Sequence, residues 1–277
     1  MKRVVLPCGE AVPALGQGTW MLGDDPGRRR EEIAALQLGM ALGLTLIDTA
    51  EMYGDGRSES LVGEAIAGRR DKLFIVSKVY PHNASRAAMP RSCEASLRRL
   101  GIEAIDLYLL HWQGAVPLAE TVQAFEALQR QGKIRHWGVS NLDPELMQSL
   151  WEVPGGAVAQ TDQVLYNLGR RGMEWDLRPW LRERQVALMA YSPIEQGRLL
   201  RQRGLVEFAR QRKMTPAQAA LAWLLAQDGV IAIPKTGQRA RLEENAGALT
   251  KSLSPDDLRE LDRLFPPPSG PSPLAMI

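Results

Sequence analysis

Four residues whose side chains could together move a proton follow short apolar runs in the chain. Asp48, Lys78 and His111 each end such a run, and Tyr53 lies on the loop just after Asp48. A phenol is a poor acid at neutral pH because its reference pKa is about 10. An adjacent ammonium lowers that pKa by favouring phenolate, and a carboxylate behind the ammonium keeps it charged and oriented. A neutral imidazole can hydrogen bond to a carbonyl oxygen. If the four side chains meet, they can protonate an oxygen while a nearby donor delivers hydride to its carbon.

Each of these residues taken alone has an ordinary structural explanation. Asp48 could cap a loop or helix, Tyr53 could be a packed aromatic, and His111 could be a satisfied core histidine. Lys78 could reach water, although lysine is almost never buried unpaired. The stronger observation is that polar or aromatic residues follow all eight apolar runs: Thr19 and Trp20, Asp48, Lys78, His111, Ser140 and Asn141, Gln163, Tyr191 and Ser192, and Lys235.

The eight apolar runs alternate with amphipathic helical stretches along the chain. The runs cover about 14–20, 44–48, 73–78, 105–111, 134–141, 159–163, 186–191 and 230–234. Most of them are largely apolar rather than alternating, which is typical of parallel strands buried on both faces. Eight strand–helix units predict an α/β fold, a (β/α)8 TIM barrel with an N-terminal β-hairpin and a short C-terminal tail. A doubly wound open sheet is the alternative, but the chain contains neither GxGxxG nor GxxxxGK[ST].

The barrel prediction also places the polar residues. In a parallel barrel the chemistry lies at the carboxyl ends of the strands, so the residues that follow the runs are expected to share one mouth. No linker divides the chain, and we predict one domain over 1–277, of which 265–277 is a proline-rich tail.

Composition bears on the possible partners. The 277 residues include 34 Lys and Arg against 32 Asp and Glu, and a formal net charge of +2 gives no reason to expect nucleic acid or a membrane surface as partner. Two cysteines and three scattered histidines make no metal-ligand spacing, so no metal is expected. No apolar window approaches the roughly 20 residues of a membrane span, and the start does not fit a signal peptide. We expect a cytoplasmic protein that is a monomer or a weak oligomer.

The same residues carry a resemblance to a known family. The chain resembles the aldo/keto reductases over nearly its whole length, and within them the bacterial reductases of methylglyoxal and other small aldehydes. The matching stretches are 15–20, 48–54, Glu59 with 62–63, 77–78, 106–112, 132–135, 137–141, Gln163, 191–193 and 233–235. Their order and spacing together are very specific. The resemblance implies reduction of aldehydes and ketones to alcohols with NADPH.

The resemblance also implies roles for individual residues. Tyr53 would donate the proton, and Lys78 and Asp48 would adjust the pKa of its hydroxyl. His111 would orient the carbonyl. Residues implied to contact NADPH or NADP+ are Gly18, Thr19, Trp20, Asp48, Ser140, Asn141, Gln163, Tyr191, Ser192, Pro193, Ile194, Gln196, Gly197, Lys235, Thr236, Arg241, Glu244 and Asn245. Among these, Lys235, Thr236 and Arg241 would face the 2′-phosphate.

The substrate is expected to be a small carbonyl compound in a pocket of Trp20, Tyr53, His82, His111 and Trp112. Because the tail is short, a more open and less selective site is expected. Two alternatives from other classes stay open. The first is a lyase that uses Lys78 as a Schiff-base amine, and the second is a nucleotide-binding regulatory barrel with little turnover.

Overall fold

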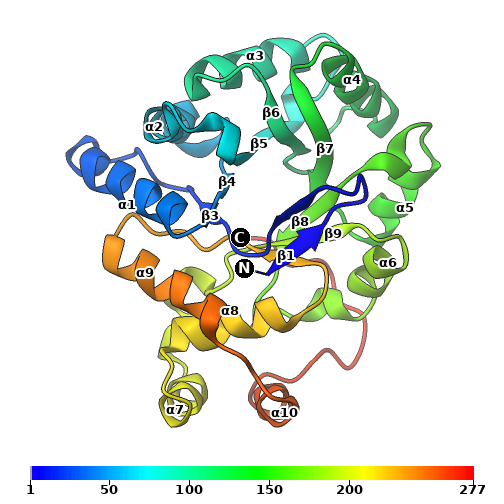
Figure 1. The fold of residues 1–277 in the computed structure, drawn as a ribbon. Coiled ribbons are helices and arrows are strands. Elements are labelled where there is room, and N and C mark those ends of the chain that lie inside the picture. Colours follow the sequence, from blue (N-terminus) through cyan, green and yellow to red (C-terminus); the bar gives the residue numbers. More distant parts are fainter. Residues whose placement is uncertain (1) are drawn as a thin grey trace.

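Eight parallel strands form the sheet at the centre of the molecule, and helices surround it (Figure 1). The computed structural model describes residues 2–277. The strands follow chain order in the sheet, and each is parallel to its neighbours: β3 (Gln17–Gly18), β4 (Leu46–Asp48), β5 (Phe74–Val79), β6 (Ile105–Leu110), β7 (Ile134–Ser140), β8 (Thr161–Leu165), β9 (Ala187–Tyr191) and β10 (Val230–Ala232).

The sheet closes on itself between its first and last strands. Leu15 pairs with Ala232, and Gly18 pairs with Lys235, in parallel bridges. The amide of Gly16 donates to the carbonyl of Ala232 at 2.9 Å, which continues the pairing between the two edges. Because closure leaves no free edge, each strand has two neighbours and the strand ends form a ring. The predicted TIM barrel is confirmed, and each of the eight predicted runs overlaps one strand of the sheet.

The helices come from the stretches between the strands. They are α1 (Arg29–Ala41), α2 (Arg57–Ile66), α3 (Met89–Leu100), α4 (Leu118–Arg130), α5 (Pro144–Glu152), α6 (Leu177–Glu183), α7 (Arg203–Gln211), α8 (Pro216–Ala226), α9 (Arg239–Gly247) and α10 (Pro255–Leu264). All residues of β5 and β6 are buried, as the continuous apolar runs predicted, because helices cover the outer face of the sheet and side chains fill the barrel. Within residues 2–277, no helix combines the length and apolar character that a membrane span requires.

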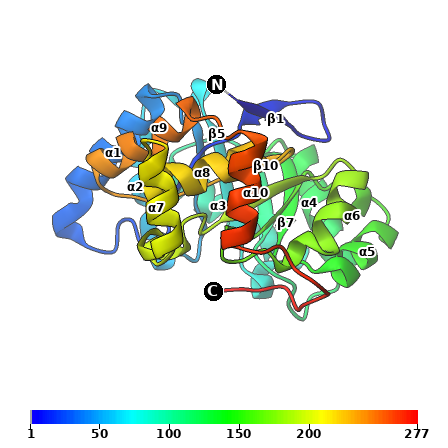
Figure 2. The same cartoon turned by 90° about the horizontal axis from the view of Figure 1, so that it is seen from below.

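A hairpin and the chain's tail lie at opposite ends of the barrel (Figure 2). The hairpin pairs β1 (Arg3–Val5) with β2 (Ala11–Pro13) in antiparallel register, as predicted, and Gly9 adopts a φ of +87° in its turn. Because the hairpin leads directly into β3, it covers the amino ends of the strands. The tail follows α10 without further helix or strand.

Close packing of α2 on α3 gives a test of the fold. A Cβ added to Gly63 in α2 would lie 2.5 Å from the carbonyl oxygen of Arg99 and 2.8 Å from that of Leu100. Gly63→Ala should therefore lower the free energy of unfolding by about 1–3 kcal/mol, measured by urea titration. Gly270→Ala is the matched control, because a Cβ there meets nothing within 4 Å. A stabilised Gly63→Ala protein, as helix propensity alone would give, contradicts this packing.

Candidate active site

A pocket of about 680 Å³ opens at the carboxyl ends of the barrel strands. Every residue expected to contact the cofactor lines it, together with Tyr53, His111 and Trp112. The fold therefore brings residues from seven of the eight strand ends to the pocket wall, and Lys78 from the remaining strand, β5, contacts Tyr53 of that wall.

Lys78 lies beneath the pocket and is completely buried. Its Nζ lies 2.8 and 2.9 Å from the two carboxylate oxygens of Asp48, and it donates to the carbonyl oxygen of Thr49 at 2.8 Å. It also donates to the hydroxyl oxygen of Tyr53 at 3.1 Å. An ammonium has three protons to donate, and three residues here accept them.

Burial and neighbouring charge act in opposite directions on the two titratable partners. Burial lowers the pKa of Lys78, but the charge of Asp48 and the contact with Tyr53 raise it, and the net shift is upward. Lys78 is therefore an ammonium at neutral pH. Burial raises the pKa of Tyr53, and this effect exceeds the lowering by the Lys78 charge. The ammonium does lower the pKa of Tyr53, as expected, but the net shift is upward because desolvation of the phenolate is the larger effect.

His111 stays neutral in this environment. Burial, and next the positive charge of Lys78, lower its pKa to about 3. The ring packs edge-on against Tyr53 at a centroid distance of 5.9 Å and lines the pocket. Its buried Nδ1 has no hydrogen-bond partner within residues 2–277. Protonation would thus place a second cation beside Lys78 in a site that water barely reaches.

Local structure explains how Tyr53 and Lys78 come to meet. Asp48 ends β4, and a tight turn over Tyr53–Gly56, with positive φ at Gly54, Asp55 and Gly56, leads the chain into α2. Within α2, buried Glu59 accepts from the hydroxyl of Ser77 at 2.6 Å and from Arg99 at 2.6 Å. Ser77 precedes Lys78 on β5. The contacts of Glu59 with Ser77 and Arg99 therefore hold α2 against the strand that carries the lysine.

Amide and hydroxyl groups line the pocket beside this cluster. Gln163 donates to Asp48 at 2.8 Å, which links the amide to the buried ion pair. Tyr191 donates to the side-chain oxygen of Asn141 at 3.1 Å, and Asn141 donates to Ser140 at 3.0 Å. Asn141 has a φ of +59°, which is uncommon for a residue other than glycine. Met21, Ser192 and Gln196, which also line the pocket, share this left-handed backbone, and such strain is concentrated at functional sites.

Two cations line the far end of the pocket. Lys235 and Arg241 line it together with Thr236, and neither makes an ion pair with a carboxylate within residues 2–277. Desolvation lowers the pKa of Lys235, the negative charge of Glu32 acts against this, and the net shift is downward. This end of the pocket is therefore suited to an anion, and α9 begins beside it.

The structure corrects one expectation about the substrate pocket. His82 does not line the pocket; it is exposed, and its ring packs on Tyr80 at a centroid distance of 4.7 Å. The physical reason is the 3₁₀ turn Pro81–Asn83 after β5, which carries His82 outward. Trp20 and Trp112 do line the pocket, and Trp20 is 43% exposed at its mouth.

Sequence reasoning also missed part of the pocket wall. The missed residues are Met21, Met52, Leu200, Arg201, Ala217, Ile233, Met276 and Ile277. Met21 and Met52 adjoin Trp20 and Tyr53, so neighbourhood in sequence was an available signal for those two. Met276 and Ile277 lie at the end of the tail, which returns to the mouth. The sequence did not predict that these tail residues line the pocket, because the tail has no hydrophobic periodicity from which its path could be inferred.

Comparison with known proteins gives a consistent result. Residues 14–265 match the aldo/keto reductase family. The chain is 51% identical to the methylglyoxal reductase YeaE of Escherichia coli, covering 96% of both chains. It is 31% identical to the glyoxal reductase of Bacillus subtilis, covering 94% of this chain and 92% of the relative. An aldo/keto reductase from Klebsiella pneumoniae, solved in complex with NADP and acetate, is 49% identical, with a TM-score of 0.98 over 100% of this chain and 99% of that chain.

The depressed pKa of His111 predicts a pH-dependent stability difference. Between pH 6.5 and about 3 the unfolded chain binds a proton at His111 and the folded chain does not. This residue should therefore cost the fold stability as pH falls through that window, by about 1.4 kcal/mol per pH unit. His111→Asn should lose less stability than the wild type from pH 6 to pH 4, measured by urea titration at each pH. Parallel pH profiles for the two proteins would show that His111 is charged in the fold.

Proposed function

This chain belongs to the aldo/keto reductase family and is an oxidoreductase; we propose that it uses NADPH to reduce small aldehydes and ketones, of the methylglyoxal type, to alcohols. The observation that carries the proposal is the hydrogen bond from the buried Lys78 ammonium to the Tyr53 hydroxyl, at the wall of a pocket that neutral His111 also lines. A relative at 51% identity is named a methylglyoxal reductase, and another at 31% a glyoxal reductase.

The pocket residues fit an extended dinucleotide with a 2′-phosphate. The cations Lys235 and Arg241, which make no salt bridge within residues 2–277, suit the phosphate, and Thr236 lines the pocket with them. Ser140, Asn141 and Gln163 would hold an amide at the other end, where Tyr191 offers a flat face. The other residues expected to contact the cofactor line the same pocket. When bound, the cofactor supplies a hydride to the substrate carbon.

The residues of this chain handle the proton. The raised pKa of Tyr53 keeps its hydroxyl protonated at neutral pH, so it can donate to the carbonyl oxygen as that oxygen gains charge. The Tyr53 oxygen then holds the negative charge, and the Lys78 ammonium 3.1 Å away stabilises it until water returns the proton. Asp48 keeps Lys78 charged and in place. Neutral His111 orients the carbonyl oxygen without competing as a proton donor.

The buried cluster disfavours the two alternatives. A Schiff-base lyase needs a neutral, accessible amine, whereas Lys78 is an ammonium with no exposed surface and three acceptors. Burial of the Lys78 ammonium beside a proton donor carries a desolvation penalty, and nucleotide binding by a regulatory barrel does not require that arrangement.

We further propose that the protein acts in the cytoplasm. Its two cysteines, exposed Cys8 and buried Cys93, are both free, which suits a reducing compartment. The expectation of a monomer or weak oligomer stays a prediction.

Tyr53→Phe tests the proton donor. The substitution removes the acidic proton and little volume, so turnover with methylglyoxal should fall by about 10²–10⁴-fold while NADPH affinity is kept. NADPH absorbance gives the rate, and quenching of tryptophan fluorescence gives the affinity. Tyr80→Phe is the matched control, because Tyr80 lies outside the pocket wall and should keep its activity. A Tyr53→Phe enzyme with near-normal turnover removes Tyr53 from the mechanism.

Arg241→Ala tests the choice of cofactor. NADH lacks the 2′-phosphate, and a charge-assisted hydrogen bond lost on NADPH should raise its dissociation constant about tenfold or more. The dissociation constant for NADH should hardly change. Arg239→Ala, an exposed arginine of the same helix that does not line the pocket, is the control. Equal effects of Arg241→Ala on both cofactors, or none on either, would reject the assignment.

A further inference from the structure

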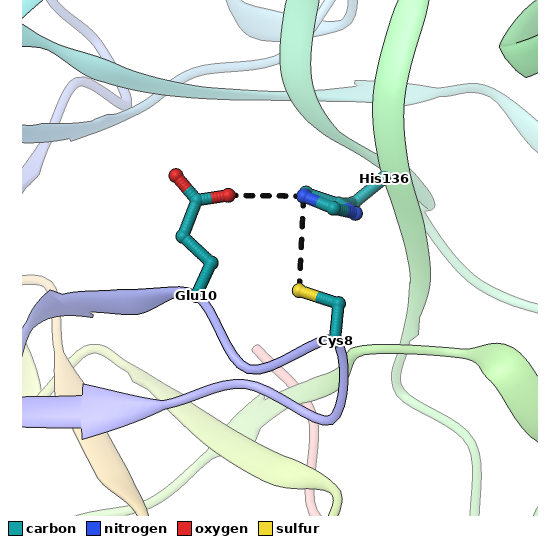
Figure 3. Close-up of side chains that lie close together, drawn as sticks. All are labelled: Cys8, Glu10 and His136. Atoms are coloured by element: carbon teal, nitrogen blue, oxygen red, sulfur yellow. Dashed lines mark hydrogen bonds and ion pairs between the residues drawn. The ribbon is translucent and has the colours of Figure 1, made fainter.

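Three side chains with metal-binding atoms meet at the end of the barrel opposite the pocket (Figure 3). Cys8 and Glu10 lie on the turn of the hairpin, and His136 lies near the start of β7. The His136 Nε2 is 3.7 Å from the Cys8 sulfur and 3.0 Å from a carboxylate oxygen of Glu10. All three donor atoms lie within 4.8 Å of one another.

The direction of these contacts separates a metal site from a catalytic triad. In a Cys–His–Glu triad the thiol and the carboxylate contact different nitrogens of the imidazole, because the carboxylate orients the ring from behind. Here both the sulfur and the carboxylate approach the same nitrogen, Nε2. The three donor atoms therefore converge on one point in front of the ring, as ligands do around a metal ion.

The spacing of the donor atoms agrees with a tetrahedral ion. With Zn–S near 2.3 Å and Zn–N and Zn–O near 2.0–2.1 Å, ligand atoms around tetrahedral zinc lie about 3.3–3.6 Å apart. The observed 3.7 Å and 3.0 Å lie within a few tenths of an ångström of that range. Small rotations of the half-buried or exposed side chains would suffice to bind an ion.

We propose that Cys8, Glu10 and His136 form a binding site for a divalent transition metal of the zinc class, with water as the fourth ligand. A thiolate, an imidazole and a carboxylate are the three side-chain ligands of zinc, and a thiolate disfavours Mg²⁺ and Ca²⁺. On binding, the thiol releases its proton to solvent, and the imidazole carries its proton on Nδ1 so that Nε2 offers a lone pair. The two anionic ligands balance the charge of the ion.

Neighbouring residues hold the ligands in place. The backbone amide of Cys8 donates to the side chain of Gln160 at 2.9 Å. Arg135 donates to Glu10 at 2.8 Å and to buried Asp106 at 2.8 Å, so the charge of the guanidinium is shared between two carboxylates. Such contacts to metal ligands fix their orientation.

The site would fasten the hairpin to the barrel, away from the chemistry. His136 and Ser140 lie at opposite ends of β7, about 13 Å apart at the rise of a strand. A metal at His136 would crosslink the hairpin to β7 without touching the pocket, and should stabilise the fold without changing turnover.

Cobalt titration tests the site in the full-length chain, prepared without a purification tag. One equivalent of Co²⁺ should give a thiolate-to-cobalt charge-transfer band with the strong visible bands of tetrahedral cobalt, and Zn²⁺ should displace it. Cys8→Ser should lose the charge-transfer band although Cys93 is still present. His136→Gln should bind Co²⁺ at least about 10–100-fold more weakly. Loss of a residue that only contacts a metal ligand already lowers metal affinity by that factor.

His82→Gln is the matched control, because it removes an exposed histidine elsewhere and should leave the titration unchanged. Unchanged reductase activity of Cys8→Ser and His136→Gln shows that both variants are folded, and it separates this test from the proposed function. Absence of a charge-transfer band in the wild type overturns the proposal. So does a band that survives in Cys8→Ser, or equal affinity in His136→Gln.

Discussion

The active site depends on one buried ammonium. Removing Lys78 from water costs several kcal/mol, and only partners of good geometry offset that cost. Asp48, the carbonyl of Thr49 and the hydroxyl of Tyr53 are those partners, and they come from β4 and the loop after it, while Lys78 comes from β5. The pairing of β4 with β5 must therefore be correct for the lysine to be buried at all. Burial also sets the protonation states around the ion pair: it lowers the pKa of His111, with the Lys78 charge acting in the same direction, and it raises the pKa of Tyr53 by more than the Lys78 charge lowers it.

Barrel closure divides the molecule into two ends with different tasks. Bridges between Leu15 and Ala232 and between Gly18 and Lys235 join the first and last strands, so all eight carboxyl ends face one mouth. The amino ends face the hairpin. Strand β7 serves both, with Ser140 in the pocket and His136 among the donor atoms beside the hairpin. The buried residues Trp137, Gly138 and Val139 separate these two positions along the strand.

The strands were predictable because parallel strands buried on both faces must be continuously apolar, and the polar residue that ends each run then marks the mouth. The direction of a side chain beyond a strand end was not predictable. His82 follows Lys78 closely in sequence, but the turn Pro81–Asn83 carries it to the surface. The cluster of Cys8, Glu10 and His136 was missed for another reason. No local spacing links a hairpin to a strand more than a hundred residues later, and only closure of the barrel brings them together.

The electrostatics of the pocket is asymmetric, and this asymmetry orients whatever binds. At one end Asp48 compensates Lys78, and His111 is neutral, so the site offers a proton and hydrogen bonds but little net field. At the other end Lys235 and Arg241 line the pocket and make no salt bridge within residues 2–277, although the charge of Glu32 acts on Lys235. A long ligand with one strongly anionic terminus gains free energy in only one of its two orientations, because the other would place that anion beside Asp48. On the proposed function, this arrangement would favour the orientation of a dinucleotide that places its 2′-phosphate at Lys235 and Arg241 and its other end at Tyr53.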